Sequence, residues 1–461
     1  MPGIWGPSRG RWYRNEGPGA SLTIAPVICD LRPYRGAGES GFRPTGAASL
    51  AAVLVKPSRR RIAALALLGA FLAGCAKDAP QDTFDPAGPN AKEIDNLQRP
   101  LFYIAGFVGL IVFAAIGYAL VKFKDRGQEI PEQSHGNPKL EIALTIIPAI
   151  ILAAIAVPTV SQVFSLDKKD NECIINVTGQ QWWWEYDYEK GSTCGGVEIT
   201  ESIVTSGELV IPAGTPVLLR ITSRDVIHSF WIPKLNGKRD AVPGRLHTLR
   251  IEADEAGLYT GQCTEFCGLS HARMRQAAVA LNTADFQTWV SNQTAPYTKP
   301  GEGTLAAEGE TTFIAQCSRC HQVNGLTDSD GQPVLAEPDL AVLAGAAPNL
   351  TNLMTRTAFA GWTFDLISDE CRDQLWNATG DEFGDLYLQG VWMNSPADAT
   401  YPVCFNESNL REWLRNAPAM KPMYTDPTKL ESTGGLTRGM PNLHLTEEQI
   451  QQIIAYLLER K

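Results

Sequence analysis

Long apolar runs without alternating polar positions gather near the start of the chain. Residues 101–121 carry no charge, and residues 142–160 form a second run that contains two prolines, which membrane helices tolerate. Each run is long enough for a membrane-spanning helix of about 20 residues. We therefore predict a two-helix transmembrane hairpin over residues 76–165, with two buried core helices as the alternative. By the positive-inside rule, the basic residues of the intervening loop make it cytoplasmic and place both flanking regions outside: Lys122, Lys124, Arg126 and Lys139.

A third apolar segment, residues 62–74, is shorter and follows three arginines. A basic stretch, a short apolar stretch and small residues are typical of an export signal. The segment ends in Leu-Ala-Gly before Cys75, which resembles a bacterial lipobox whose cysteine becomes lipidated. A short membrane helix with an incidental cysteine is the alternative. Residues 1–75 are thus predicted to be an N-terminal extension and a lipoprotein-type signal, unless the start codon lies further downstream.

After residue 166 the pattern changes to short β-branched and aromatic runs separated by Gly and Pro. Such runs indicate strands of a compact sandwich or barrel, here over residues 166–295. Residues 296–308 read as a Pro/Gly-rich linker, and the remaining chain, residues 309–461, is predicted to be an all-α domain. The clearest strands cover residues 174–177, 208–211, 217–221 and 246–251, and the clearest helix is an amphipathic closing helix over residues 445–458.

Composition narrows the function only a little. The formal net charge of −10 comes without a sustained basic stripe, which argues against a nucleic-acid partner. The ten cysteines are many for a cytosolic chain and few for a disulfide scaffold, so their spacing must decide what they do.

The sharpest motif lies between residues 263 and 274. Two cysteines four residues apart, a histidine and a methionine form a soft ligand set, which selects copper over hard cations. Two bridging thiolates can hold two copper ions close enough to share one electron. A second imidazole is expected from His228, between two predicted strands. A structural zinc site and a disulfide between the two cysteines are the alternatives. The set comprises Cys263, Cys267, His271 and Met274.

A second motif is Cys-x-x-Cys-His, in which Cys317 and Cys320 can attach a c-type haem and His321 can bind its iron. A redox pair or a chance match is the alternative. A methionine is expected as the second axial ligand because its thioether raises the potential of the iron. Met440 precedes the closing helix and is favoured, and the competitors are Met420, Met423 and His444.

The motif from residue 263 to residue 274 resembles that of the CuA domain of cytochrome c oxidase subunit II, Cys-x-Glu-x-Cys-x3-His-x2-Met. The resemblance covers residues 95–285 and includes the segments 181–186, 225–230 and 240–245. It implies a cupredoxin-like domain with a dinuclear copper centre. The Glu265 carboxylate would reach a magnesium ion shared with the catalytic subunit. The implied copper ligands are His228, Cys263, Cys267, His271 and Met274, with Glu265 ligating through its backbone carbonyl.

The same resemblance assigns two further roles. Trp182 matches the tryptophan through which electrons enter the family's copper centre, although a tryptophan on a strand is more often a packing residue. Glu141 matches an acidic residue at the entrance of a proton pathway, although a glutamate at a helix start is also an ordinary dipole contact. Leu144 replaces a tryptophan that is usual in the family.

The C-terminal part resembles a class I cytochrome c, with Phe313 before the Cys-x-x-Cys-His motif, residues 348–350 after it and the closing helix. It departs from that family by an insertion over residues 357–407. Four cysteines remain in the predicted exported part, where disulfides are stable, and we expect the pairs Cys371–Cys404 and Cys173–Cys194.

These resemblances imply the electron-input subunit of a haem–copper terminal oxidase in a bacterial cell membrane, with both extramembrane domains on the outer face. Single electrons would pass from cytochrome c or a cytochrome bc-type complex through haem c and CuA to subunit I, beside subunit III. That other subunit would reduce O2 and pump protons, because the spanning segments here contain no histidine for an oxygen site. The alternatives are a nitric oxide reductase subunit, an assembly subunit without metals and a free-standing electron carrier. Six histidines are too few for a nitrous oxide reductase.

Overall fold

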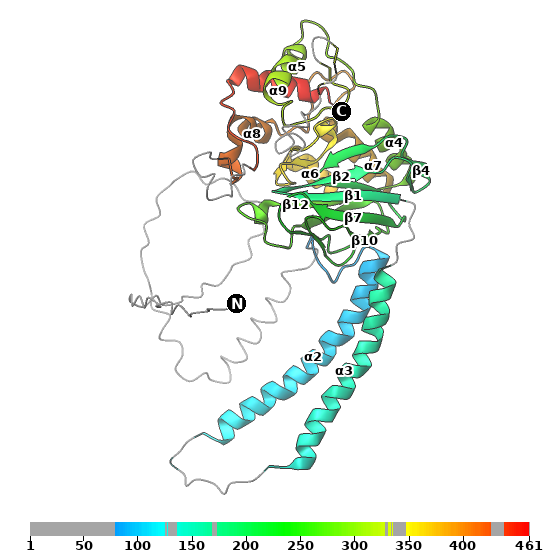
Figure 1. The fold of residues 1–461 in the computed structure, drawn as a ribbon, viewed down its shortest axis with the longest axis vertical. Helices are drawn as coiled ribbons and strands as arrows, with labels where there is room; N and C mark the ends of the chain where they lie inside the picture. Colours follow the sequence, from blue (N-terminus) through cyan, green and yellow to red (C-terminus); the bar gives the residue numbers. More distant parts are fainter. Residues whose placement is uncertain are drawn as a thin grey trace, which may run out of the picture. The chain divides into compact units, whose positions relative to one another are not determined.

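A computed structural model describes residues 79–124, 127, 136–167, 173–327, 331–332, 334, 347–425 and 438–460. The predicted extension and signal, with Cys75, lie outside these residues. Within them, two helices are long and apolar enough to cross a membrane, α2 (Pro89–Lys122) and α3 (Pro138–Leu166), which are the two long helices of Figure 1. Each begins with proline at its first turn, where the missing N–H costs nothing. The two predicted spanning segments are therefore confirmed as parts of longer helices.

The start of α2 is tied to the edge strand β10 (His247–Ile251) of the β domain. The Asn90 side chain donates a 2.9 Å hydrogen bond to the carbonyl of Arg250, whose guanidinium donates back to Asn90 at 2.8 Å. The backbone approaches so closely at Gly88 that a Cβ there would lie 2.0 Å from the carbonyl oxygen of Glu252. Glycine is thus required where the membrane helix meets the sheet.

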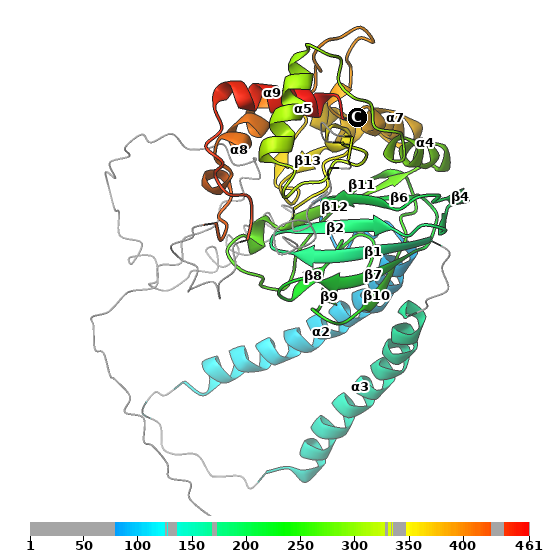
Figure 2. The same cartoon turned by 45° about the horizontal axis from the view of Figure 1, so that its top comes forward.

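Two sheets form the β domain. In the five-stranded sheet the order is β10–β7–β1–β2–β5, with β1 parallel to β7 and antiparallel to β2 (Figure 2). The three-stranded sheet has the order β11–β12–β6. Short pairs complete the domain. The strands are β1 (Cys173–Gln180), β2 (Trp183–Tyr188), β3 (Thr193–Cys194), β4 (Val197–Glu198), β5 (Ile203–Ser206), β6 (Glu208–Pro212), β7 (Val217–Ser223), β8 (His228–Phe230), β9 (Arg239–Ala241), β11 (Gly257–Gln262) and β12 (Arg275–Leu281).

Alternation along the strands fixes their register and builds the core. In β1 every second side chain is buried, so Val177 lies opposite Tyr186 of β2 and Ile221 of β7 in one apolar layer. A one-residue slip would turn this layer to solvent. The disulfide Cys173–Cys194 joins the start of β1 to β3, which is the pairing expected from the sequence. The predicted all-β domain is confirmed.

The C-terminal region is mainly helical, and its first and last helices cross closely. At Gly309 of α5, a Cβ would lie 2.0 Å from the carbonyl oxygen of Gln452 in α9, and the rings of Phe313 and Tyr456 meet at 5.1 Å. Side-chain caps start both helices, with a capping box at Thr446 for α9. The helices are α4 (Thr283–Gln293), α5 (Leu305–Gln316), α6 (Asp369–Asn377), α7 (Gly380–Gln389), α8 (Glu407–Met420) and α9 (Glu447–Leu458), with 3-10 turns η2 (His271–Arg273), η4 (Leu353–Thr355) and η5 (Gly390–Trp392).

Two details differ from the sequence-based prediction. The region after residue 309 is not all-α, because β13 (Ala358–Phe359) and β14 (Phe364–Asp365) pair as a small hairpin within the predicted insertion. Two-residue strands are too short to show alternation, so the pattern could not reveal them. The predicted linker over residues 296–308 is also shorter than expected, because α5 begins at Leu305 behind the N-cap Thr304. The second expected disulfide, Cys371–Cys404, closes the insertion.

The predicted insertion packs against the β domain through buried polar groups. The carboxylate of Glu208, 1% exposed on β6, accepts hydrogen bonds from Thr357 (backbone N–H at 2.8 Å, and hydroxyl), the Trp362 indole at 3.2 Å and the Tyr387 hydroxyl at 2.9 Å. The buried guanidinium of Arg356 donates to the Ser206 hydroxyl at 2.9 Å. Burial lowers the pKa of Arg356 to about 10. Buried polar groups with several partners fix one arrangement of the two regions.

Candidate metal centre

The metal-binding loop, residues 263–274, joins the antiparallel strands β11 and β12. The last pair of that ladder is Gln262 with Arg275, and Cys263 N–H donates to the Met274 carbonyl at 2.9 Å, so the sheet itself closes the base of the loop. His228 is the first residue of β8, a strand and not the loop position expected from the sequence. The fold therefore brings together a histidine and a loop that lie 35 residues apart in the chain.

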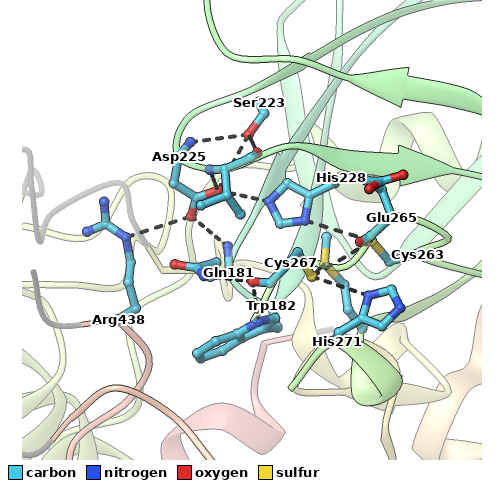
Figure 3. A network of polar contacts seen from close by, with 12 residues as sticks. Gln181, Trp182, Ser223, Asp225, His228, Cys263, Glu265, Cys267, His271 and Arg438 are labelled. Atoms are coloured by element: carbon cyan, nitrogen blue, oxygen red, sulfur yellow. Dashed lines mark hydrogen bonds and ion pairs between the residues drawn. The ribbon is translucent and has the colours of Figure 1, made fainter. Parts of the chain in front are cut away.

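Six potential donors converge here, and Figure 3 labels all of them except Met274. The two thiols lie 3.8 Å apart, and His228 Nδ1 is 3.9 Å from Cys263 Sγ. On the other side, Cys267 Sγ lies 3.6 Å from His271 Nδ1 and 3.8 Å from Met274 Sδ. The backbone carbonyl of Glu265 points at Cys263 Sγ, 3.3 Å away. All of the donors expected from the sequence are thus brought together by the fold.

This donor set fits a pair of soft metal ions. Metal–thiolate bonds are about 2.3 Å long, so two sulfurs 3.8 Å apart can both bridge the same two ions. One imidazole lies beside each sulfur, His228 near Cys263 and His271 near Cys267, and these imidazoles, the thioether and the carbonyl would supply the other ligands of the two ions. A tetrahedral zinc site would use only four of these six groups, and the thioether is a ligand that copper takes more readily. His228, Cys263, Cys267 and Met274 are all buried.

An acidic side chain orients the first imidazole. Asp225 Oδ1 lies 2.8 Å from His228 Nε2 (Figure 3), which turns Nδ1 toward the sulfurs. The carboxylate also accepts from the backbone N–H groups of Gln181 at 2.8 Å and Val226 at 2.7 Å. Burial opposes ionisation, but the hydrogen bond from His228 and these amides outweigh it and lower the pKa of Asp225. A carboxylate behind a ligating histidine fixes its tautomer and raises its basicity.

The two thiols are hydrogen-bonded to each other, with their sulfurs 3.8 Å apart. Their mutual hydrogen bond lowers the pKa of Cys263 and, together with burial, raises the pKa of Cys267. One thiolate is therefore readily formed, and a bound cation would favour loss of the second proton.

Trp182 lies directly beside the metal-binding loop. Its indole N–H donates to the carbonyl of Cys267 at 3.1 Å, and only 2% of its surface is exposed. The side chain is thus positioned by the loop. It does not form an open surface in this chain, because residues of the C-terminal region cover it.

The Cys-x-x-Cys-His segment follows the end of α5, with Cys317 as the C-cap residue. His321 Nδ1 lies 2.8 Å from the carbonyl oxygen of Pro348, which can only accept, so Nδ1 carries the proton and Nε2 is left free as a ligand. Metal-bound histidines are commonly held in this way. Burial lowers the pKa of His321, which keeps the imidazole neutral. Both thiols are unbonded, and these donors fit covalent attachment of a haem.

The structure keeps two methionines together as candidates for the second axial position. The Met423 sulfur lies so near Gly439 that a Cβ on that glycine would be 2.4 Å from it, and Gly439 directly precedes Met440. His444 is exposed and Met420 ends α8. The favoured ligand Met440 and its competitor Met423 therefore share one locality.

Comparison with known proteins gives the same family for both matched parts. Residues 78–161 match the family described as cytochrome c oxidase subunit II, transmembrane domain, and residues 173–281 match its periplasmic domain. The cytochrome c oxidase subunit 2 of Alkalihalophilus pseudofirmus is 37% identical over 300 residues, which cover 63% of this chain and 84% of that protein. The chain belongs to the cytochrome c oxidase subunit II family.

Other members extend the likeness. The cytochrome c oxidase subunit 2 of Bacillus sp. (strain PS3) is 30% identical over 417 residues, which cover 86% of this chain and 95% of that protein. A crystal structure of the periplasmic domain of subunit II from Bradyrhizobium japonicum is 29% identical and covers 27% of this chain and 95% of its own, with a TM-score of 0.24. As a subunit II, this chain is part of a haem–copper oxidase, an oxidoreductase complex, and its periplasmic domain implies a CuA copper site.

Two further residues with predicted roles in this subunit II, Glu141 and Glu265, have exposed side chains. Glu141 is in the first turn of α3, exposed, where its carboxylate accepts from the Asn137 N–H at 3.3 Å. The Glu265 side chain is exposed, pointing away from the copper donors. Sequence reasoning gave no role to Asp225, although it stands three residues before His228, and none to Lys421 or Tyr424, whose contacts with Trp182 join residues far apart in sequence.

Proposed function

We propose that this subunit II receives single electrons at a c-type haem and passes them through a dinuclear copper centre to the catalytic subunit. His228, Cys263, Cys267, His271, Met274 and the Glu265 carbonyl would hold the copper pair, which supplies one-electron redox chemistry with little change of geometry. The convergence of these six donors at van der Waals distances carries the proposal.

The haem would be held by Cys317, Cys320 and His321, with Met440 as the second axial ligand. Three observations support this half. His321 presents Nε2, α5 and α9 cross closely at Gly309, and the relative from Bacillus sp. (strain PS3) aligns over a length that reaches beyond the two matched family models. The chain then comprises an extension and signal to residue 75, the hairpin to 165, the copper domain to 295 and a haem domain from 309 with the insertion 357–407.

The chain's own residues make the copper site stiff. The β11–β12 ladder closes the metal-binding loop, Asp225 fixes the His228 ring, and the Trp182 indole holds the Cys267 carbonyl. Fixed ligands need little rearrangement when one electron arrives, which favours fast transfer. Glu265 would direct its carboxylate to a magnesium ion shared with subunit I, a hard ligand for a hard ion. Glu141 would stand at the entrance of a proton pathway there.

The proposal also covers the place of this subunit in the membrane and its partners. Both domains would lie on the outer face of a bacterial membrane, with Cys75 lipidated, and the neighbours would be oxidase subunits I and III. The donor would be cytochrome c or a cytochrome bc-type complex, and the catalytic subunit would reduce O2 to water and pump protons.

Metal and haem analysis of the detergent-solubilised full chain tests the two halves separately. We expect copper rather than zinc, in an amount that matches a pair per chain, and one covalent haem by the pyridine haemochrome assay. A zinc-loaded protein would refute the copper half. A protein with copper but no covalent haem would refute the haem half alone.

A further inference from the structure

The C-terminal region closes over Trp182. The Tyr424 ring packs on the Trp182 indole with 5.1 Å between centroids and 50° between planes. Lys421 Nζ donates to the Trp182 carbonyl at 2.9 Å and to the Ala360 carbonyl at 2.7 Å. A Cβ on Gly361 would lie 2.3 Å from that same Trp182 carbonyl. No protein outside this chain can therefore rest on the indole without displacing these residues.

The segment 420–424, which contains Lys421 and Tyr424, also forms hydrogen bonds with the metal-binding loop. Ser270 donates to the Pro422 carbonyl at 2.5 Å, and the Arg273 guanidinium donates to the Met420 carbonyl. Both loop residues lie within the β11–β12 connection that carries His271. Two hydrogen bonds thus hold the segment 420–424, which carries Tyr424, against the metal-binding loop.

Gly268, the residue after Cys267, lets two rings reach the loop. A Cβ at this position would lie 3.1 Å from the Tyr424 hydroxyl oxygen and 3.2 Å from Trp182 Cζ2. The backbone there has a φ of +114°, which only glycine adopts readily. The absence of a side chain is what allows the tyrosine, the tryptophan and the cysteine backbone to meet.

On its other side, Tyr424 is joined to the segment of the favoured haem ligand. Arg438 N–H donates to the Tyr424 carbonyl at 2.9 Å, and Arg438 Nε lies 3.7 Å from Asp225 Oδ2. Arg438 is two residues before Met440, and the Met423 sulfur abuts Gly439. Tyr424 therefore contacts the segment 438–440, which carries Met440, on one side and lies beside the metal-binding loop on the other.

We propose that Tyr424 is the contact through which an electron passes from the haem domain to Trp182 and the Cys267 backbone, and that Lys421 is the positioning residue that keeps this contact closed. The inference rests on the proposed function. One electron leaves an iron(II) haem, which becomes iron(III), and is accepted by the oxidised copper pair. No bond forms or breaks, no proton moves, and neither ring is itself oxidised.

The physical reason is the continuity of contact. Transfer through packed rings and a hydrogen bond is faster than transfer across a gap, and here the path runs from the Tyr424 ring through the indole and its N–H to the Cys267 carbonyl at 3.1 Å. Lys421 is 3% exposed, and burial lowers its pKa to about 7. Charged or neutral, its amine can donate to both carbonyls.

The test is intramolecular electron transfer in the full, haem- and copper-loaded chain. After photochemical reduction of the haem, its reoxidation and the bleaching of the copper near-infrared band are followed together. Tyr424→Leu removes the ring and should slow transfer roughly tenfold, a rate ratio equivalent to about 1.4 kcal/mol. The matched control Tyr424→Phe keeps the ring and should transfer at the wild-type rate. Haem content and the copper paramagnetic resonance spectrum should be unchanged in both.

Wild-type transfer in Tyr424→Leu, with both spectra intact, would overturn the inference and leave the proposed function standing. A wild-type protein that lacks the haem or the copper pair would instead refute the proposed function, and the inference about Tyr424 would fall with it. Should Tyr424→Leu fail to assemble, Lys421→Met decides. A slower transfer with intact spectra supports the contact, and an unchanged rate refutes it.

Discussion

The metal-binding loop and the Cys-x-x-Cys-His segment each contribute two cysteines and a histidine to a site that a methionine would complete, but the chain holds the two sets of donors differently. In the copper loop, six donors from β8 and the β11–β12 connection already meet within 3.3–3.9 Å between neighbours. In the haem segment three donors lie within five consecutive residues, and the methionine comes from a separate segment over a hundred residues later. The sheet preorganises the first site, whereas the cofactor itself must complete the second.

This difference explains how each site is anchored. The copper donors depend on strand register and on Asp225, whose carboxylate holds the nearby His228 and accepts a hydrogen bond from the distant Gln181 N–H. The haem donors depend on one helix end and on the crossing of α5 with α9. Damage to one site should therefore leave the other intact, which makes the comparison testable.

The largest effect is expected from Cys267→Ser. This sulfur lies within 3.8 Å of Cys263 Sγ, His271 Nδ1 and Met274 Sδ, so its loss removes the centre of the donor set. Copper content should fall to background by elemental analysis while covalent haem stays at the wild-type level. The reciprocal variant Cys320→Ser should lose one thioether bond to the haem and keep its copper. Loss of both cofactors in either variant would contradict the independence of the two sites.

A smaller effect is expected at Asp225, whose carboxylate orients the predicted metal ligand His228. Asp225→Asn keeps the shape but removes the charge that orients His228, and such changes cost roughly 10–100-fold in metal affinity. Copper titration against a competing chelator measures it. Asp240→Asn removes a carboxylate charge nearby, at an oxygen that accepts a 2.8 Å hydrogen bond from the Ser229 hydroxyl; it is the matched control and should retain near-normal affinity. Equal affinity of both variants and wild type would show that Asp225 has no orienting role.

The anchoring of the C-terminal region on the β domain can be tested through Glu208. Its replacement by leucine leaves four hydrogen-bond donors of three residues unsatisfied and the Arg356 charge less compensated, which should lower the free energy of unfolding by about 3–5 kcal/mol. Chemical denaturation of the full chain gives the value. The exposed Glu198→Leu on β4 is the control, with an expected change below about 0.5 kcal/mol. Comparable losses in the two variants would argue against a buried anchor.

The smallest effect is expected at the helix crossing. In Gly309→Ala the new methyl group would meet the Gln452 carbonyl, so α5 and α9 must separate, at a cost of about 1–3 kcal/mol. Thermal unfolding followed at the haem absorbance band reports it. Gly301→Ala, where the nearest atom is an ordinary contact at 3.5 Å, should have little effect. An unchanged midpoint for Gly309→Ala would mean that this crossing does not support the haem segment.

Local pattern predicted much of this molecule. The apolar runs, the alternation in β1 and the spacing of Cys263, Cys267, His271 and Met274 are contiguous signals, and the fold contains all of them. The position of Lys421 and Tyr424 against Trp182 was beyond such reasoning, because those contacts join residues about 240 apart. The β13–β14 hairpin was missed for the opposite reason, since its strands are too short to carry a period.

We propose above all that two copper ions, bridged by the thiolates of Cys263 and Cys267, share one unpaired electron. Electron paramagnetic resonance of the oxidised full chain, recorded on a frozen sample, tests it most directly. We expect a spectrum in which one unpaired electron couples equally to two copper nuclei, and this signal should disappear on one-electron reduction. A spectrum of a single isolated copper ion, or no copper signal from a metal-loaded protein, would contradict it.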